Sequence, residues 1–181
     1  METLADLLRN EILWRNTDLV ANLVSRQPGL FGELFRIFSG NTEPLSRRAA
    51  WALDIVSEKN PELIQPYLDE IVDLLPSFRH DGLKRHSLRM LSRSPLPSES
   101  HLGNLVNLCF DLLLSPGESV SAKVYSMEIL YRISQIEPDL KKELADSIEW
   151  RMNEETPGFK NRGQKIMKKL YSEIAANQKA L

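Results

Sequence analysis

Apolar residues recur at spacings of three and four along almost the whole chain, which is the pattern of amphipathic helices. One apolar stripe runs over 63–75 and another over 102–113, and no stretch alternates convincingly for more than about five residues. Breakers such as Pro28-Gly29 and Pro116-Gly117 separate the stripes. Proline suits the first turn of a helix and glycine its exit, so these pairs mark boundaries. The sequence therefore predicts an all-α chain.

We expect ten helices, near 2–14, 17–27, 29–39, 44–58, 62–75, 81–93, 98–114, 118–134, 138–155 and 159–176. Thr17, Ser98 and Ser119 are predicted to cap the helices that they precede. Pro66 follows Pro61 by little more than one turn, so the helix at 62–75 must begin late or kink.

The helices follow a repeat. When Leu53 is placed over Leu91 and Leu130, at steps of 38 and 39 residues, small and apolar residues fall in register, with another helix before each segment. A two-helix unit of this length cannot bury its faces alone, and stacking on its neighbours supplies the core. The pattern predicts a single domain over 1–181, with cap helices at 1–27 and repeats at 28–176.

The segment at 45–56, Leu-Ser-Arg-Arg-Ala-Ala-Trp-Ala-Leu-Asp-Ile-Val, resembles the second helix of a HEAT repeat. Such a helix opens with a basic residue and runs through alanines to a leucine, often after an acidic residue in the preceding turn. Asp81 with Lys84 or Arg85, and Glu118 with Lys123, are similar to that arrangement, and Glu43 with Arg47 is a looser match. The resemblance implies a right-handed α-α superhelix of about four to five antiparallel helix pairs, with the second helices on the concave side.

Charge is unevenly distributed between the two helix classes. The chain carries a net charge of −2, yet the second helices at 45–58, 81–93, 118–134 and 158–174 sum to +7. The first helices at 62–75, 98–114 and 137–155 sum to −10. The second-helix face should therefore attract anions, although an ordinary solvated helix surface gives the same count. The candidate partner-binding residues are Arg48, Trp51, Arg85, Arg89, Arg93, Arg132, Arg162, Lys165 and Lys169.

The sequence offers little for catalysis, a metal or a cofactor. Cys109 is the single cysteine, which excludes an intrachain disulfide, and its apolar surroundings predict a packed core thiol. His80, His86 and His101 lack the spacing of a helical zinc site and are interpreted as turn or surface residues. The acidic pair Glu154-Glu155 is expected at a solvated helix end.

Trp51 and Asp54 suggest one enzymatic alternative. HEAT-like alkylpurine DNA glycosylases use aromatic residues, an aspartate and basic side chains on their concave face, and Trp51, Asp54 and the nearby arginines resemble these in type. Only Tyr125 is placed to add a second aromatic residue. The competing interpretation is a tryptophan packed between repeats.

The leading hypothesis is a non-catalytic scaffold that binds an acidic segment of another protein on its second-helix face. Nucleic-acid binding through the same arginines is the alternative, and it predicts steep salt dependence. We expect a cytoplasmic protein, because the start lacks a signal peptide pattern and no apolar run approaches the roughly 18 residues that cross a bilayer. A monomer is favoured, although the helices carrying Phe31, Phe35 and Phe38 offer either a cap or a dimer surface.

Overall fold

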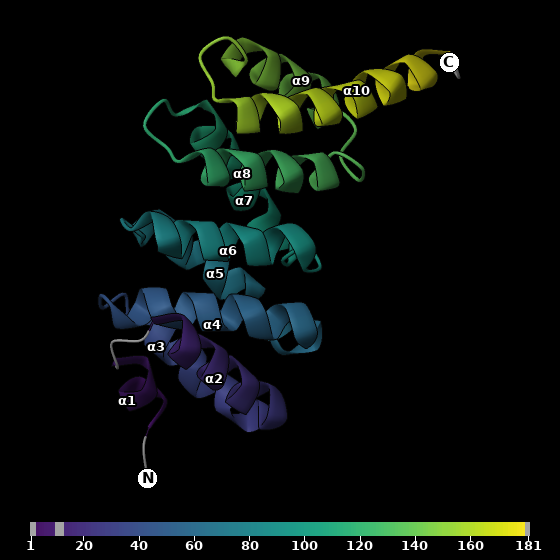
Figure 1. Ribbon diagram of the computed structural model, residues 1–181. Coiled ribbons are helices and arrows are strands. Elements are labelled where there is room, and N and C mark those ends of the chain that lie inside the picture. The colour runs from purple at the N-terminus through teal and green to yellow at the C-terminus, as the bar shows by residue number, and fades with distance from the viewer. Residues whose placement is uncertain (1–2, 10–12, 180–181) are drawn as a thin grey trace. The chain divides into compact units, whose positions relative to one another are not determined.

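A computed structural model describes residues 3–9 and 13–179, without the side chains of 13, 14 and 177–179 (Figure 1). The described residues form ten α-helices, four short 3-10 segments and no strand. The prediction of an all-α, HEAT-like chain is therefore confirmed. The chain divides into two compact units, Met1–Pro97 and Ser98–Leu181. The single-domain organisation and the right-handed superhelix stay predictions.

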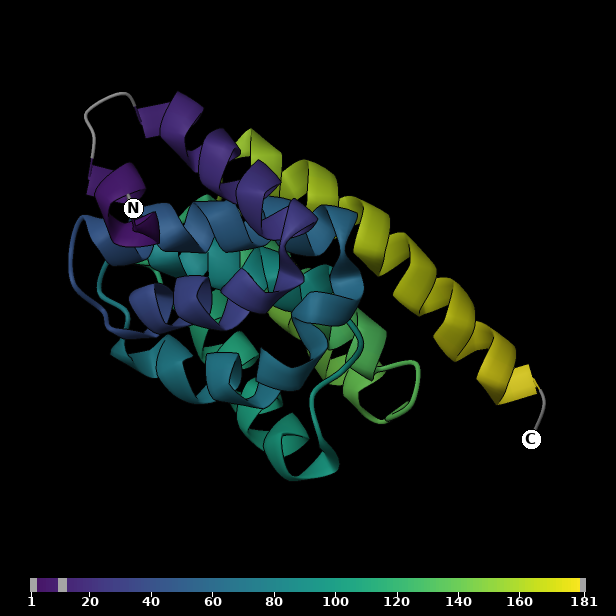
Figure 2. The ribbon, with the colours of Figure 1, turned by 90° about the horizontal axis from the view of Figure 1, so that it is seen from below.

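Unit 1 contains α1 (Leu4–Arg9), α2 (Leu13–Arg26), α3 (Phe31–Ser39), α4 (Leu45–Lys59), α5 (Leu68–Leu74) and α6 (Asp81–Arg93). Helix α4 is central and packs against α2, α3 and α6, with α6 beside it in Figure 1 and α2 lying along it in Figure 2. Ala49, Ala50 and Ala52 are completely buried. Their small side chains let three neighbouring helices approach α4, which explains the alanine-rich pattern of this segment.

Aromatic side chains build the other side of the unit 1 core. The ring centroids of Phe35 and Tyr67 lie 4.3 Å apart, and those of Phe38 and Phe78 lie 5.2 Å apart. Phe31, Phe35 and Phe38 are at most 3% exposed. These phenylalanines therefore pack inside unit 1 and are not available as a dimer surface.

The segment before α5 shows what its two prolines do. Pro61 and Pro66 each lie in a 3-10 segment, Pro61–Leu63 and Gln65–Tyr67, and α5 begins only at Leu68. A proline has no N–H to donate and disfavours helical geometry in the residue before it, so a regular helix cannot form across both. The late start expected from Pro66 is confirmed.

Unit 2 contains α7 (Glu99–Leu114), α8 (Val120–Ile133), α9 (Leu140–Arg151) and α10 (Pro157–Lys179). Helix α8 packs against α7 and α10, and α10 packs against α9. The core includes Cys109, which is completely buried, so the prediction of a packed thiol is confirmed. Gly163 permits the close approach of α10 to α9, because a Cβ there would lie 2.9 Å from Cγ2 of Ile148. The last turns of α10 extend past α8 and α9 (Figures 1 and 2).

The predicted helix caps have mixed outcomes. Ser119 caps α8 as expected, because its Oγ accepts a hydrogen bond from the N–H of Ala122 at 3.3 Å. Ser98 stands at the start of α7 but makes no capping bond, since its Oγ lies 2.9 Å from Nδ1 of His101 instead. The prediction for Thr17 is wrong: this residue lies inside α2 and is 1% exposed, because the helix begins earlier and Thr17 is on its buried side.

Candidate functional site

A buried carboxylate joins the two second helices of unit 1. Asp54 of α4 is completely buried, and its Oδ2 lies 2.8 Å from Nδ1 of His86 and 2.8 Å from Nη1 of Arg89. Its Oδ1 lies 2.6 Å from Nη2 of Arg93. Positions 86, 89 and 93 share one face of α6, so three side chains from one stripe converge on a single aspartate.

The surroundings of Asp54 keep it ionised. Burial alone raises the pKa of a carboxyl group, but the hydrogen bonds from His86 and Arg89 and the charge of Arg93 hold the pKa of Asp54 below its usual value. Glu58, one turn further along α4, lies 3.2 Å from Nη2 of Arg89 and 3.7 Å from Nη1 of Arg93. Two of the candidate arginines are thus bound to acidic side chains of the neighbouring helix.

His86 connects the buried Asp54 to two exposed residues, Arg85 and Trp51. Nη2 of Arg85 lies 3.3 Å from Nε2 of His86. A guanidinium group only donates, so Nε2 accepts, and the ring proton on Nδ1 is donated to Asp54. The ring of Trp51 stacks on the ring of His86, with the two ring centroids 6.2 Å apart and the ring planes at 13°. We call Trp51, Asp54, Glu58, Arg85, His86, Arg89 and Arg93 the Trp51 cluster.

Two interpretations from the sequence need correction here. His86 is 7% exposed and buried, not a surface residue, because it pairs with an aspartate 32 positions earlier in the chain. Trp51 packs only in part between repeats: its ring stacks on His86 of the next second helix, but the residue stays 37% exposed. The tryptophan thus presents part of its ring at the surface, stacked on His86, which also contacts the exposed Arg85.

The remaining basic candidates are not members of this cluster. Nη1 of Arg48 donates a hydrogen bond to the carbonyl oxygen of Leu8 and ties α4 to α1. In unit 2, Arg162 of α10 forms an ion pair with Glu128 of α8. Arg132 of α8 is half-buried, and burial lowers the pKa of its guanidinium group.

Two lysines of α10 form the other exposed basic patch. Lys165 and Lys169 are both exposed and lie four positions apart, on the same side of the helix. Nζ of Lys169 lies 5.1 Å from the centroid of the Tyr131 ring, which favours a cation–π contact. Within unit 2, the structure thus brings Lys165, Lys169 and Arg162 together along α10.

A second buried ion cluster holds unit 2 together. Oε1 of Glu155 lies 2.6 Å from Nζ of Lys123 and also binds Nη2 of Arg151, and all three side chains are at most 4% exposed. The expectation that Glu155 lies at a solvated helix end is wrong. The α9–α10 connection folds back on itself, so Glu155 meets a lysine 32 positions earlier in α8.

The predicted turn pair of Glu43 and Arg47 is confirmed, with Nε of Arg47 3.3 Å from Oε2 of Glu43.

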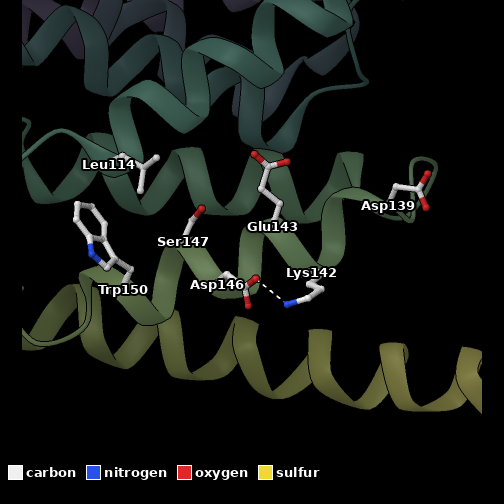
Figure 3. A pocket seen from close by; sticks show the side chains of 7 residues that line it. All are labelled: Leu114, Asp139, Lys142, Glu143, Asp146, Ser147 and Trp150. Atoms are coloured by element: carbon white, nitrogen blue, oxygen red, sulfur yellow. Dashed lines mark hydrogen bonds and ion pairs between the residues drawn. The ribbon is translucent and has the colours of Figure 1, made fainter.

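Sequence reasoning missed a pocket on the first-helix side of unit 2 (Figure 3). The pocket has a volume of about 510 Å³ and is lined by Leu114, Asp139, Lys142, Glu143, Asp146, Ser147 and Trp150. Trp150, near the end of α9, is 67% exposed, and it lies beside Leu114 at the opposite end from Asp139. The sequence held one signal for this pocket. Trp150 lies in an acidic amphipathic helix, at a position that the repeat pattern does not assign to the core.

Two searches of the described residues bear on the class of site. Within 3–9 and 13–179, no three histidine, cysteine, aspartate or glutamate residues are grouped so that they could hold a metal ion. None of the helices found there combines the length and the apolar character needed to cross a membrane.

Comparison with known proteins addresses the whole fold. A family model described as the HEAT repeat domain matches residues 4–170. Searches of curated proteins and of solved structures find no match. The family match covers both units and agrees with the packing of α4 on α6 in unit 1 and of α8 on α10 in unit 2. The chain therefore belongs to the HEAT repeat domain family.

Proposed function

We propose that this protein is a non-catalytic scaffold that binds an acidic segment of another protein on its second-helix face. HEAT repeats typically mediate protein interactions. The observation that carries the proposal is the exposed Trp51, fixed by its stacking on His86 and flanked by Arg85. Tryptophan and arginine dominate the binding energy of protein interfaces, above all where their position is fixed before binding.

The sign of the partner's charge follows from the Trp51 cluster. The guanidinium groups of Arg89 and Arg93 face the carboxylates of Asp54 and Glu58 there, and Asp54 is buried beneath them. The exposed Arg85 adds a third positive charge against these two negative ones. The exposed part of the cluster is therefore cationic around an aromatic ring. In unit 2, Lys165 and Lys169 add a second cationic patch on α10. An acidic segment with an apolar or aromatic residue fits the first patch.

The two alternatives receive less support from the geometry. A nucleic-acid surface needs arginines whose donors reach phosphates, but Arg89 and Arg93 direct theirs at Asp54 and Glu58. A glycosylase needs a carboxylate that reaches the substrate. The carboxylate of Asp54 is completely buried and bound by three side chains, so its role is to join α4 and α6.

A selection experiment tests the proposal. A library of displayed 12-residue peptides is selected on the immobilised chain and counter-selected on a Trp51→Ala, Arg85→Glu variant. We expect the enriched peptides to be acidic with an apolar or aromatic residue. Their affinity should fall at least about tenfold in the variant, because an anchor and its charge partner are removed. Leu19→Ala removes an apolar side chain that is 57% exposed on α2, and is the matched control.

Three results would contradict the proposal. The first is a set of enriched peptides without an acidic bias, and the second is equal affinity of these peptides for the double variant and the unchanged chain. Tight binding of single-stranded or duplex oligonucleotides at about 50 mM salt, lost in the same variant, would favour the nucleic-acid alternative instead.

A further inference from the structure

The Trp150 pocket of unit 2 lies on the opposite class of helix from the Trp51 cluster and has the opposite charge. Asp139, Glu143 and Asp146 line it together with one basic residue, Lys142, whose Nζ lies 2.8 Å from Oδ2 of Asp146 (Figure 3). The ion pair neutralises one carboxylate, so two remain to give the pocket a negative charge. Trp150 and Leu114 form its apolar end.

A second groove continues this surface between α7 and the start of α9. It has a volume of about 420 Å³ and shares Asp139 with the Trp150 pocket. Its apolar side chains include Leu102, Val106 and Leu140, and its acidic ones are Glu99 and Glu137. The Trp150 pocket and this second groove together form an apolar groove with acidic edges, which we call the α7–α9 track.

The dimensions of the α7–α9 track suit a short helix. A helix rises about 1.5 Å per residue, so Leu140 at one end and Trp150 at the other are separated by about 15 Å along α9. About three turns of a bound helix, or 10 to 14 residues, cover this distance. A groove between two helices that offers apolar anchors at both ends is a common receptor for an amphipathic helix.

We propose that the α7–α9 track is the docking site for a basic amphipathic helix of another protein. Trp150 is the anchor at one end, and an apolar residue of the partner packs against it and Leu114. Lysine or arginine side chains of the partner then lie next to the carboxylates along the edge of the track. Such a scaffold joins two different proteins, one acidic and one basic, through a second-helix site in unit 1 and a first-helix site in unit 2.

A second copy of this chain fits the track poorly. Its most basic helix is α10, which carries Lys165, Lys168 and Lys169 at exposed positions. Within the described side chains of α10, however, Tyr171 is the one large apolar or aromatic side chain that is exposed, and its hydroxyl donates to Glu149. The apolar side of α10 is already buried against α8 and α9. A separate protein with both apolar and basic residues is the better occupant.

Designed peptides test the proposal directly. The probes are fluorescein-labelled 14-residue helices with leucines along one face and lysines elsewhere. One comparison peptide keeps the leucines and replaces lysine with glutamate, and another scrambles the order. We expect fluorescence anisotropy to show binding of the basic amphipathic peptide alone. The affinity should fall about 30-fold in Trp150→Ala, the effect of losing an interface anchor, and at least tenfold in Glu143→Lys, Asp146→Lys.

Matched variants keep the interpretation clear. Leu19→Ala removes another exposed apolar side chain, and Glu70→Lys reverses an exposed charge on α5 of unit 1. Neither should change the affinity for the basic peptide. Trp150→Ala should also leave the binding of acidic peptides intact, so failure here and failure of the proposed acidic-segment site are distinguishable.

Four outcomes would overturn the proposal. The first is no binding of the basic amphipathic peptide at concentrations up to about 1 mM. The second is equal binding of the scrambled peptide, which shows charge attraction without a groove. The third is an unchanged affinity in Trp150→Ala. The fourth is self-association of the unchanged chain in sedimentation velocity that Trp150→Ala abolishes, which assigns the track to a second copy.

Discussion

Oδ2 of Asp54 lies 2.8 Å from Nη1 of Arg89, although the two residues are 35 positions apart and belong to successive second helices. The contact makes Asp54 a link between α4 and α6, and we expect its removal to destabilise unit 1. In Asp54→Asn the buried donors of Arg93 lose their charged partner. Breaking a buried ion network from one side costs about 3 kcal/mol or more of unfolding free energy. Urea denaturation followed by circular dichroism measures this loss.

Glu58→Gln is the matched control for Asp54→Asn. Glu58 binds the same two arginines, but its side chain is 58% exposed, so water replaces the lost interaction. Solvent-exposed ion pairs contribute about 0.5 kcal/mol or less. Equal destabilisation by the two variants would show that burial does not distinguish Asp54 from Glu58, and would contradict the role assigned to Asp54.

The buried carboxylates also predict how stability changes with pH. The pKa of Asp54 is held below its ordinary value of 3.8, and that of Glu155 below 4.5; in each case hydrogen bonds and positive charges outweigh burial. A lowered pKa in the folded state means that the unfolded chain binds protons first as the pH falls. Both contributions are therefore complete well above pH 5 and are lost as the pH falls through the two folded-state pKa values.

Urea midpoints measured between pH 7 and pH 3 test this expectation. We expect little change above pH 5 and a steep fall below about pH 4. Asp54→Asn should show a shallower fall, because one of the linked protons no longer binds. A parallel curve for Asp54→Asn and the unchanged chain would mean that Asp54 titrates alike in the folded and unfolded states.

The fold was largely predictable because it depends on local patterns. Apolar periodicity and breakers placed the helices from α3 onward close to their observed positions, including α4 and α6. Pro66 correctly indicated the late start of α5. The first two helices were less accurate at their ends, because Thr17 has the residue type of a cap but lies inside α2. Residue type alone does not reveal which side of a helix is buried.

The candidate site was less predictable because it depends on pairs distant in the chain. Counting charges by helix treated Arg89 and Arg93 as available cations, whereas the fold aims both at Asp54. Similarly, Lys123 was matched to the nearby Glu118, and the structure pairs it with Glu155. The charge count could not say which charges neutralise one another.

Cys109 gives a simple probe of unit 2. Burial raises the pKa of its thiol to about 12, so almost no thiolate exists at neutral pH, and the sulfur is completely buried. We expect no reaction with a thiol reagent such as DTNB at pH 8 in the native chain, and one equivalent reacting in about 6 M guanidinium chloride. Rapid labelling of the native chain would show that α7 opens readily. Cys109→Ser, which removes the thiol, is the blank for this measurement.

Two helical glycines should respond to alanine with opposite signs. Gly103 lies inside α7, and a Cβ built there meets nothing within 4 Å. Gly103→Ala should therefore raise the unfolding free energy by about 0.5–1 kcal/mol, because alanine has the higher helix propensity. Gly163 lies inside α10, where the same Cβ would be 2.9 Å from Cγ2 of Ile148 and 3.1 Å from Cε of Met152.

The overlap at position 163 outweighs the gain in helix propensity. Forcing an extra carbon into a packed contact costs about 1–3 kcal/mol, so we expect Gly163→Ala to lower the unfolding free energy by about 1 kcal/mol. Thermal denaturation of the two variants and the unchanged chain gives the signs directly. If both substitutions stabilise the chain, α9 and α10 do not approach as closely as the contact with Ile148 requires. A smaller loss for Gly163→Ala in an Ile148→Leu background than in the unchanged chain would locate the strain at this contact, because leucine lacks the Cγ2 methyl group that meets the new Cβ.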